Sequence, residues 1–184
     1  MATVPNIFAN LNPATLPVIS GYPSVNLALF DQNFADIISP VNLETGAVLT
    51  GTTTIPLADT IPTNSQGTQI MSLAITPKLS TSKLRIDVLA MLSHDFIGVG
   101  MMTVGLFQDT TVNALACISK AHYRNNPEIF VFTHYMTSGL TVATTFYVRA
   151  GSNQIGNMTF NGYAGNRIFG GSLASSITIT EIAA

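Results

Sequence analysis

Positive charge is missing from the first 77 residues of this chain, which contain no lysine or arginine. Charged residues make up only 9% of the 184 residues, against roughly 25% in an ordinary soluble domain. So little charge is too little to keep the whole surface of a monomer in solution. The composition therefore indicates either a chain that lies in a membrane or one whose surface is largely buried in an assembly.

Long uninterrupted apolar runs are also missing. The stretch 84–92 contains Arg85 and Asp87, whereas a membrane-spanning helix needs about 20 predominantly apolar residues. The opening residues have neither a basic n-region nor a compact apolar h-region, so we do not expect a secretory signal. We therefore expect an assembly protein without a membrane partner.

Motifs for catalysis and for nucleic-acid binding are absent as well. The seven basic residues are scattered over 78–184 and no two are adjacent, so no basic stripe for nucleic acid is formed. The nine acids leave few candidates for paired catalytic carboxylates. There is no Gly-x-Ser-x-Gly elbow and no phosphate loop ending in Gly-Lys-Ser/Thr. We expect neither an enzyme nor a nucleic-acid partner.

Cysteine and histidine are rare. The single cysteine, Cys117, excludes an internal disulfide, and the apolar run 112–118 around it predicts a buried, inert thiol. The three histidines are His94, His122 and His134, and their spacing matches no metal motif. A three-histidine site would need ligands from separate strands, so we favour structural histidines and expect no metal or other cofactor.

The opening segment combines proline with large apolar side chains. Five of the nine prolines lie in the first 40 residues, which excludes a long helix or a central strand. A disordered tail would be polar and charged. Residues 1–46 are therefore predicted to form an extended arm that lies on an apolar surface of another chain. The residues expected to make that contact are Ile7, Phe8, Leu11, Leu16, Leu27, Phe30, Phe34 and Ile37.

One short helix is predicted inside this arm, over residues 25–38. Leu27, Phe30 and Phe34 recur at the three- and four-residue spacing of an amphipathic helix. Ser24 can cap its N-terminus, and Pro40 prevents it from continuing.

From about residue 47 the sequence takes on a β character. Thr, Ser, Val and Ile dominate, and turn residues recur roughly every 8–12 positions, as in a sandwich or barrel. In 176–182 the isoleucines alternate with polar residues. Residues 47–184 are therefore predicted to form a jelly-roll-like antiparallel β-sandwich. The expected strands are 47–55, 67–76, 83–94, 99–108, 112–121, 129–138, 141–150, 155–160 and 173–182.

Three of the predicted strands, 99–108, 129–138 and 141–150, are apolar on both faces. A sandwich strand needs only one apolar face. Subunits packed about a threefold axis would cover the second. The residues expected in the core or around that axis are Met101, Phe130, Phe132 and Phe146.

Two segments carry a resemblance to a known family. Residues 29–35, Leu-Phe-Asp-Gln-Asn-Phe-Ala, resemble the LDxNFA element near the start of many tailed-bacteriophage virion proteins, with Phe30 where Leu is usual. The ending 169–182 is similar to the last strand of small trimeric jelly-roll modules of phage virions, which are TNF-like or C1q-like in shape. The resemblance implies a trimeric virion component.

Two functions remain open for such a component. The first is a capsid cement or decoration protein on the capsid surface, with a second and third copy of itself and the major capsid protein as partners. The short chain, with no shaft between arm and knob, favours this function. The alternative is a tail-fibre or spike tip that binds a host surface glycan. Its candidate ligand residues are Tyr123, Asn125, Asn126, Asn161, Tyr163 and Asn166.

Overall fold

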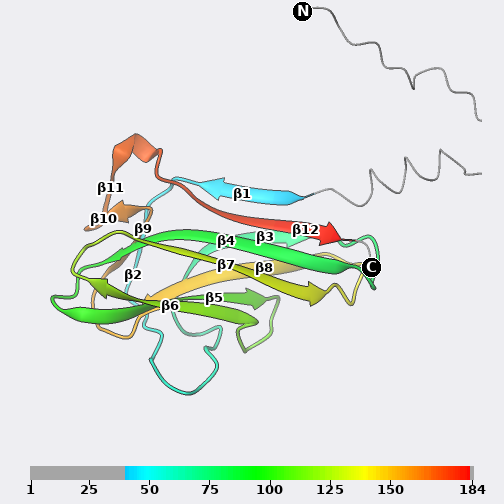
Figure 1. Ribbon diagram of the computed structural model, residues 1–184, viewed down its shortest axis with the longest axis horizontal. Helices are drawn as coiled ribbons and strands as arrows, with labels where there is room; N and C mark the ends of the chain where they lie inside the picture. The colour runs from blue at the N-terminus through cyan, green and yellow to red at the C-terminus, as the bar shows by residue number, and fades with distance from the viewer. Residues whose placement is uncertain (1–39, 183–184) are drawn as a thin grey trace, which may run out of the picture. The chain divides into compact units, whose positions relative to one another are not determined.

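The computed structural model describes residues 40–182, which form an antiparallel β-sandwich (Figure 1). This confirms the mainly-β prediction. The arm up to residue 39 and the predicted helix 25–38 lie outside the described residues. Within residues 40–182 the helical structure is a single 3-10 turn, η2 (Phe169–Gly171).

The first sheet contains four strands side by side and a short extension. The order is β1 (Val41–Thr45), β12 (Ser175–Ile182), β4 (Lys83–His94) and β7 (Glu128–Thr137). Past Ser175, where β12 begins, the same edge of β4 pairs with β9 (Met158–Phe160). β9 in turn pairs with β2 (Leu49–Gly51). β7 pairs only with β4 among the described residues, so it forms an edge of this sheet.

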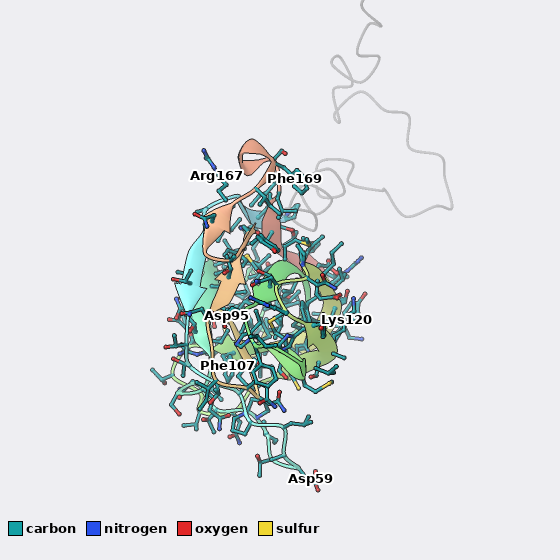
Figure 2. All side chains as sticks on the ribbon, turned by 90° about the vertical axis from the view of Figure 1, so that its left-hand side faces the viewer. Asp59, Asp95, Phe107, Lys120, Arg167 and Phe169 are labelled. Carbon is teal, nitrogen blue, oxygen red and sulfur yellow. The ribbon has the colours of Figure 1, made fainter. Side chains whose placement is uncertain are left out.

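The second sheet has four strands. The order is β3 (Thr68–Ile75), β8 (Thr144–Ser152), β5 (Val99–Gln108) and β6 (Ala116–Tyr123). A small hairpin of β10 (Gly162–Tyr163) and β11 (Asn166–Arg167) lies between β9 and η2 in the sequence. In Figure 2 this hairpin region, marked by Arg167, lies at the opposite end of the molecule from Asp59.

The core lies between the two sheets and follows the period-two alternation of the strands. Along β4, Leu84, Ile86 and Val88 are at most 1% exposed, whereas the residues between them face outward. Phe130 of β7 extends this core within the same sheet, and Phe146 of β8 faces it from the second sheet. Full burial of each such side chain stabilises the fold by about 1.5–3 kcal/mol.

The predicted strands agree well with the observed ones, apart from the start of the sandwich. Strands 83–94 and 99–108 match β4 and β5 residue for residue. Of the predicted strand 47–55, only β2 forms. Residues 41–45, assigned to the arm by the 1–46 boundary, form β1 and pair with β12. The compact sandwich therefore begins at Pro40, because Val41 and Leu43 alternate with polar residues and pack against the core.

The outer side of the second sheet is partly covered by the same chain. Phe107 on this side of β5 is 1% exposed, and the segment 52–66 runs back over the sheet. Ile55 N–H donates to the Ser152 carbonyl at 3.0 Å, and Ala114 N–H donates to the Pro62 carbonyl at 2.9 Å. On β5, then, Phe107 is covered within one chain, whereas Val99 at the other end of the same face is 71% exposed.

Candidate interaction surface

The outer side of β4 and β7 carries a row of apolar side chains, which we call the β4–β7 face. It consists of Leu89, Met91, Ile129, Val131 and Tyr135. Met91 is directly opposite Ile129, and Leu89 is directly opposite Val131. Ile129 and Val131 are 55% and 56% exposed. Directly opposed side chains on one face lie about 4.5–5.5 Å apart at Cβ, so these four form one continuous patch.

Alternation along β7 explains why this patch exists. Phe130 and Phe132 point to the core, which sends Ile129 and Val131 to the outside. No segment of residues 40–182 covers them, in contrast to the segment 52–66 on the other sheet. Covering such side chains with another apolar surface is favourable by about 25 cal/mol per Å² of apolar area. A contiguous exposed apolar patch of this kind is typical of an interaction site.

Towards the other end of β4 the same face becomes polar. Arg85 Nε forms an ion pair with Asp87 Oδ2 at 3.0 Å. Thr133 Oγ1 donates to Asp87 Oδ1 at 2.6 Å, and Tyr135 lies opposite Arg85. An apolar centre beside a polar border is the usual anatomy of a protein–protein interface.

The four residues predicted for the core or the threefold axis do not gather on this face. Phe130 and Phe146 are 1% and 0% exposed and lie in the core. Phe132 is half-buried against that core. Met101 is half-buried on the outer side of β5, in the other sheet. Sequence reasoning noted the double apolar character of residues 129–132 but could not tell which of them point outward.

The eight predicted arm contacts lie outside the described residues. They are Ile7, Phe8, Leu11, Leu16, Leu27, Phe30, Phe34 and Ile37. Their expected contact with another chain stays a prediction.

Two of the three histidines come together, which the sequence did not indicate. The ring centroids of His94 and His122 are 4.9 Å apart. His134 lies on β7 opposite Ile86, eight positions along β4 from His94. Among residues 40–182, no group of three or more His, Cys, Asp or Glu side chains is placed to hold a metal ion.

The environment of Cys117 differs from the prediction. Its side chain is exposed, because it points to the outer side of the edge strand β6, opposite Gly105. It lines an open cavity of about 420 Å³ together with residues 58–62 and 114–116. The apolar run around it correctly indicated a strand but not which face the thiol occupies.

The candidate glycan residues divide into structural and exposed ones. Asn161 is 0% exposed; its Nδ2 donates to the carbonyls of Thr45 and Ala47, and its Oδ1 accepts from Ser175 Oγ. It therefore cannot offer its amide to a ligand. Tyr123 and Tyr163 are 58% and 46% exposed. Phe169, an aromatic residue that was not among the candidates, is 74% exposed and lies at the end of the sandwich marked by Arg167 (Figure 2).

Residues 40–182 contain no helix that is both long and apolar enough to cross a bilayer.

Comparison with known proteins gives only distant likenesses. No family model matches the chain, and no curated protein matches it. A solved structure of dimeric latent PorU from Porphyromonas gingivalis has a TM-score of 0.41 and 7% identity over 79% of this chain and 13% of that chain. Infectious bursal disease virus, Gx strain, gives a TM-score of 0.37 and 10% identity over 80% of this chain and 37% of that chain.

A third likeness is to the tailspike protein 4 of bacteriophage CBA120, in its enzymatically active domain. The TM-score is 0.26 at 11% identity, over 78% of this chain and 19% of that chain. The chain thus spans well under two thirds of the length of each of these solved chains. Likenesses of this size assign neither a family nor a function.

Proposed function

We propose that this chain is a structural virion protein: a capsid cement or decoration protein that assembles as a homotrimer and binds the major capsid protein. The observation that carries the proposal is the uncovered β4–β7 face, in a chain with only 9% charged residues. A surface of this kind gains free energy from association and needs no catalytic group. On this proposal the protein is not an enzyme and is located on the capsid surface.

The strand order supports the jelly-roll-like part of the proposal. The sheets run β1-β12-β4-β7 and β3-β8-β5-β6. Chain neighbours such as β3 and β4, or β7 and β8, therefore lie in different sheets, as in a double-sheet jelly roll.

Each part of the chain has its own role in the proposal. The β4–β7 face joins three copies. The segment before Pro40 carries the eight apolar contacts to coat protein. In the sequence it is followed by β1, which pairs with β12 (Figure 1). Three such segments on one trimer would bind the capsid multivalently, which raises avidity without any new contact.

Sedimentation of the full chain tests the trimer. Val131→Lys places a charge in the middle of the β4–β7 face and should convert trimer to a folded monomer, because Val131 is exposed in the single chain. Ala74→Lys is the matched control, since Ala74 is exposed on the outer side of β3 in the other sheet. A monomeric wild type, or a Val131→Lys variant that remains trimeric, would contradict this part of the proposal.

A particle-binding assay tests the capsid contact separately. Deletion of residues 1–39 should leave a folded trimer that no longer binds capsids. If the truncated protein still decorates particles at full occupancy, the proposal that this segment binds the capsid is wrong.

The alternative, a tail-fibre or spike tip that binds a host surface glycan, is favoured by Tyr163 and Phe169. Both are aromatic side chains exposed at one end of the molecule, where they could stack on a sugar. Locating the protein on intact particles distinguishes the two functions: cement covers the head in many copies, whereas a tip is confined to the tail.

A further inference from the structure

The adjacent histidines join the two sheets at one end of the sandwich. His94 is the last residue of β4 in the first sheet, and His122 is near the end of β6 in the second. Each is 2% exposed. Their rings are tilted by 53° with centroids 4.9 Å apart, so the two side chains pack against each other inside the protein.

Two glycines leave the space that these rings occupy. Gly100 is the cross-strand partner of His122, and a Cβ there would lie 2.6 Å from His122 Nε2. At Gly156, where φ is +150°, a Cβ would lie 2.7 Å from His94 Cε1. Neither position could carry a side chain without displacing a ring. The local backbone is thus closely fitted to the histidine pair.

The hydrogen bonds fix His94 in its neutral form. His94 Nδ1 accepts the backbone N–H of Phe96 at 3.1 Å, so Nδ1 carries no proton while this bond exists. Protonation of the ring adds a proton to Nδ1. The Nδ1–H group and the Phe96 N–H group would then both be donors facing each other, and the hydrogen bond would be lost.

His122 has little capacity to accommodate a charge. Its Nε2 lies 3.0 Å from Ser152 Oγ, whereas its Nδ1 is buried without a partner. A protonated ring would donate from both nitrogens. It would therefore bury a positive charge with one N–H unpaired, beside the ring of His94.

The charged groups around the pair do not offset this cost. Asp95 already accepts the backbone N–H and the Nδ2 of Asn157 at 2.8 and 2.9 Å. Glu128 on β7 forms an ion pair with Lys120 of β6. Arg124, on the adjoining turn, is exposed and adds a like charge. Residues 153–157, which pack over the pair, contain no ionisable side chain.

Burial lowers the pKa of both rings, and the neighbouring His122 lowers the pKa of His94 further. For His94 the largest cause is burial, followed by the neighbouring His122, with Asp95 acting in the opposite direction. For His122 the cause is again burial, opposed by Glu128. Both groups therefore bind protons more weakly in the folded protein than at the ordinary value of 6.5.

Two loops are bonded to this pair through side chains, and a third adjoins it. Asn125 N–H donates to the backbone carbonyl of His94 at 2.6 Å, so the turn 124–127 adjoins the pair without contacting a ring nitrogen. Ser152 Oγ, the partner of His122, accepts the N–H of Gln154 at the start of the loop 153–157. Phe96, bonded to His94 itself, begins the loop 95–98.

We propose that His94 and His122 form an acid-sensitive latch: the neutral pair holds the ends of β4 and β6 together, and a proton on either ring releases the loops 95–98 and 153–157. A folded pKa below the unfolded one means that the latch is fully stable above pH 6.5 and weakens as the pH falls through that value. Release would uncover the pair and the strand ends beneath the loops. The latch does not depend on the proposed virion function.

Amide hydrogen exchange of the full chain at about pH 7.5 and about pH 5.5, corrected for intrinsic rates, tests the latch. Exchange at about pH 5.5 should rise in the two loops by up to about tenfold for each histidine, the limit set by the roughly one pH unit between 6.5 and 5.5, while the centres of β4 and β8 stay protected. The double variant His94→Asn, His122→Gln should lose this pH dependence. Asn retains an acceptor near Nδ1 of His94, and Gln retains a polar group near Nε2 of His122.

His134→Gln is the matched control and should behave as the wild type, because His134 lies far from the pair. If the double variant does not fold, imidazole NMR titration of the wild type and of His122→Gln takes its place. Both wild-type rings should titrate below 6.5, and His94 should titrate at higher pH in the single variant. A ring that titrates at or above 6.5, or loop exchange whose pH response is unchanged by removing both histidines, would overturn the proposal.

Discussion

Glu181 shows how a single inward-facing carboxylate can fix a turn. It is 8% exposed at the end of β12. Its oxygens accept the N–H groups of Lys78 and Leu79 at 2.9 and 3.1 Å and the hydroxyl of Ser82 at 2.6 Å. Burial alone would raise the pKa of Glu181, but these hydrogen bonds outweigh it and hold the pKa below its usual value.

We predict that Glu181→Gln lowers the free energy of unfolding by about 1–3 kcal/mol at neutral pH, because the amide turns an N–H₂ group towards donors. Chemical denaturation at pH 7 measures this loss. Glu44→Gln, at an exposed position on β1, should change stability by less than about 0.5 kcal/mol. Equal effects of the two variants would show that the Glu181 network does not stabilise the turn.

Two phenylalanines make a sharp contrast of burial. Phe146 is 0% exposed and Phe169 is 74% exposed. We predict that Phe146→Ala costs about 3–5 kcal/mol of unfolding free energy, because it leaves a core cavity. Phe169→Ala should stay within about 0.5 kcal/mol. A large loss at Phe169 would mean that its side chain is buried in the assembled protein.

At the residue scale, the sequence indicated which side chains are buried better than it indicated which side chains contact each other. Phe130 and Phe146 were expected in the core or around a threefold axis because they lie in strongly apolar strands, and both lie in the core. The contact between His94 and His122 could not, because it depends on how β4 and β6 come together across the two sheets. The exposed thiol of Cys117 was missed for a related reason: an edge strand has a free outer face that an apolar run does not reveal.

At the element scale, length and alternation decided which strands could be predicted. β4 and β5, with 12 and 10 residues, were placed correctly. β1 has five residues and directly follows Pro40, so it reads as part of a proline-rich segment. It becomes a strand through pairing with β12, more than 130 residues away, and no local pattern contains that information.

The sequence placed the end of the N-terminal arm at residue 46, whereas the compact sandwich begins at Pro40. Two truncations compare these boundaries. Deleting residues 1–39 leaves β1 in place and should not change the unfolding midpoint of the sandwich. Deleting residues 1–46 removes β1 with Val41 and Leu43. It should cost about 1–3 kcal/mol from lost apolar burial and leave the edge of β12 open to aggregation. Thermal unfolding and light scattering of both truncations measure this, and identical behaviour would place β1 outside the stable fold.

At the scale of the whole molecule, the two sheets differ in how the apolar side chains on their outer faces, away from the core, are covered. On the outer side of β5, Phe107 is covered by the same chain, whereas Val99 is 71% exposed. The outer side of β7 has no such cover among residues 40–182. Composition indicated that some apolar surface must be covered, but only the sheet order shows which strand is left with an open face. The β4–β7 face is therefore a result of topology rather than of composition.

The pH dependence of global stability should show two separate declines. His94, His122 and His134 all have pKa values lowered from 6.5 by burial, so the unfolded chain binds protons first as the pH falls through 6.5. The pKa of Glu181 lies below 4.5. Hydrogen bonds from Asn157 likewise hold the pKa of Asp95 below 3.8, although burial opposes them. Stability contributed by these two carboxylates is present above their unfolded values and is lost only in stronger acid.

We therefore predict that the unfolding free energy of the full chain is flat above about pH 6.5, declines below it, and declines again below about pH 4.5. Denaturant titrations at closely spaced pH values measure the curve. The double histidine variant should show a smaller decline below pH 6.5 and an unchanged decline below pH 4.5. Glu181→Gln should show an unchanged decline below pH 6.5 and a smaller one below pH 4.5. A stability that rises between pH 7 and pH 5 has the wrong sign for buried neutral histidines and would show that their folded pKa values lie above 6.5.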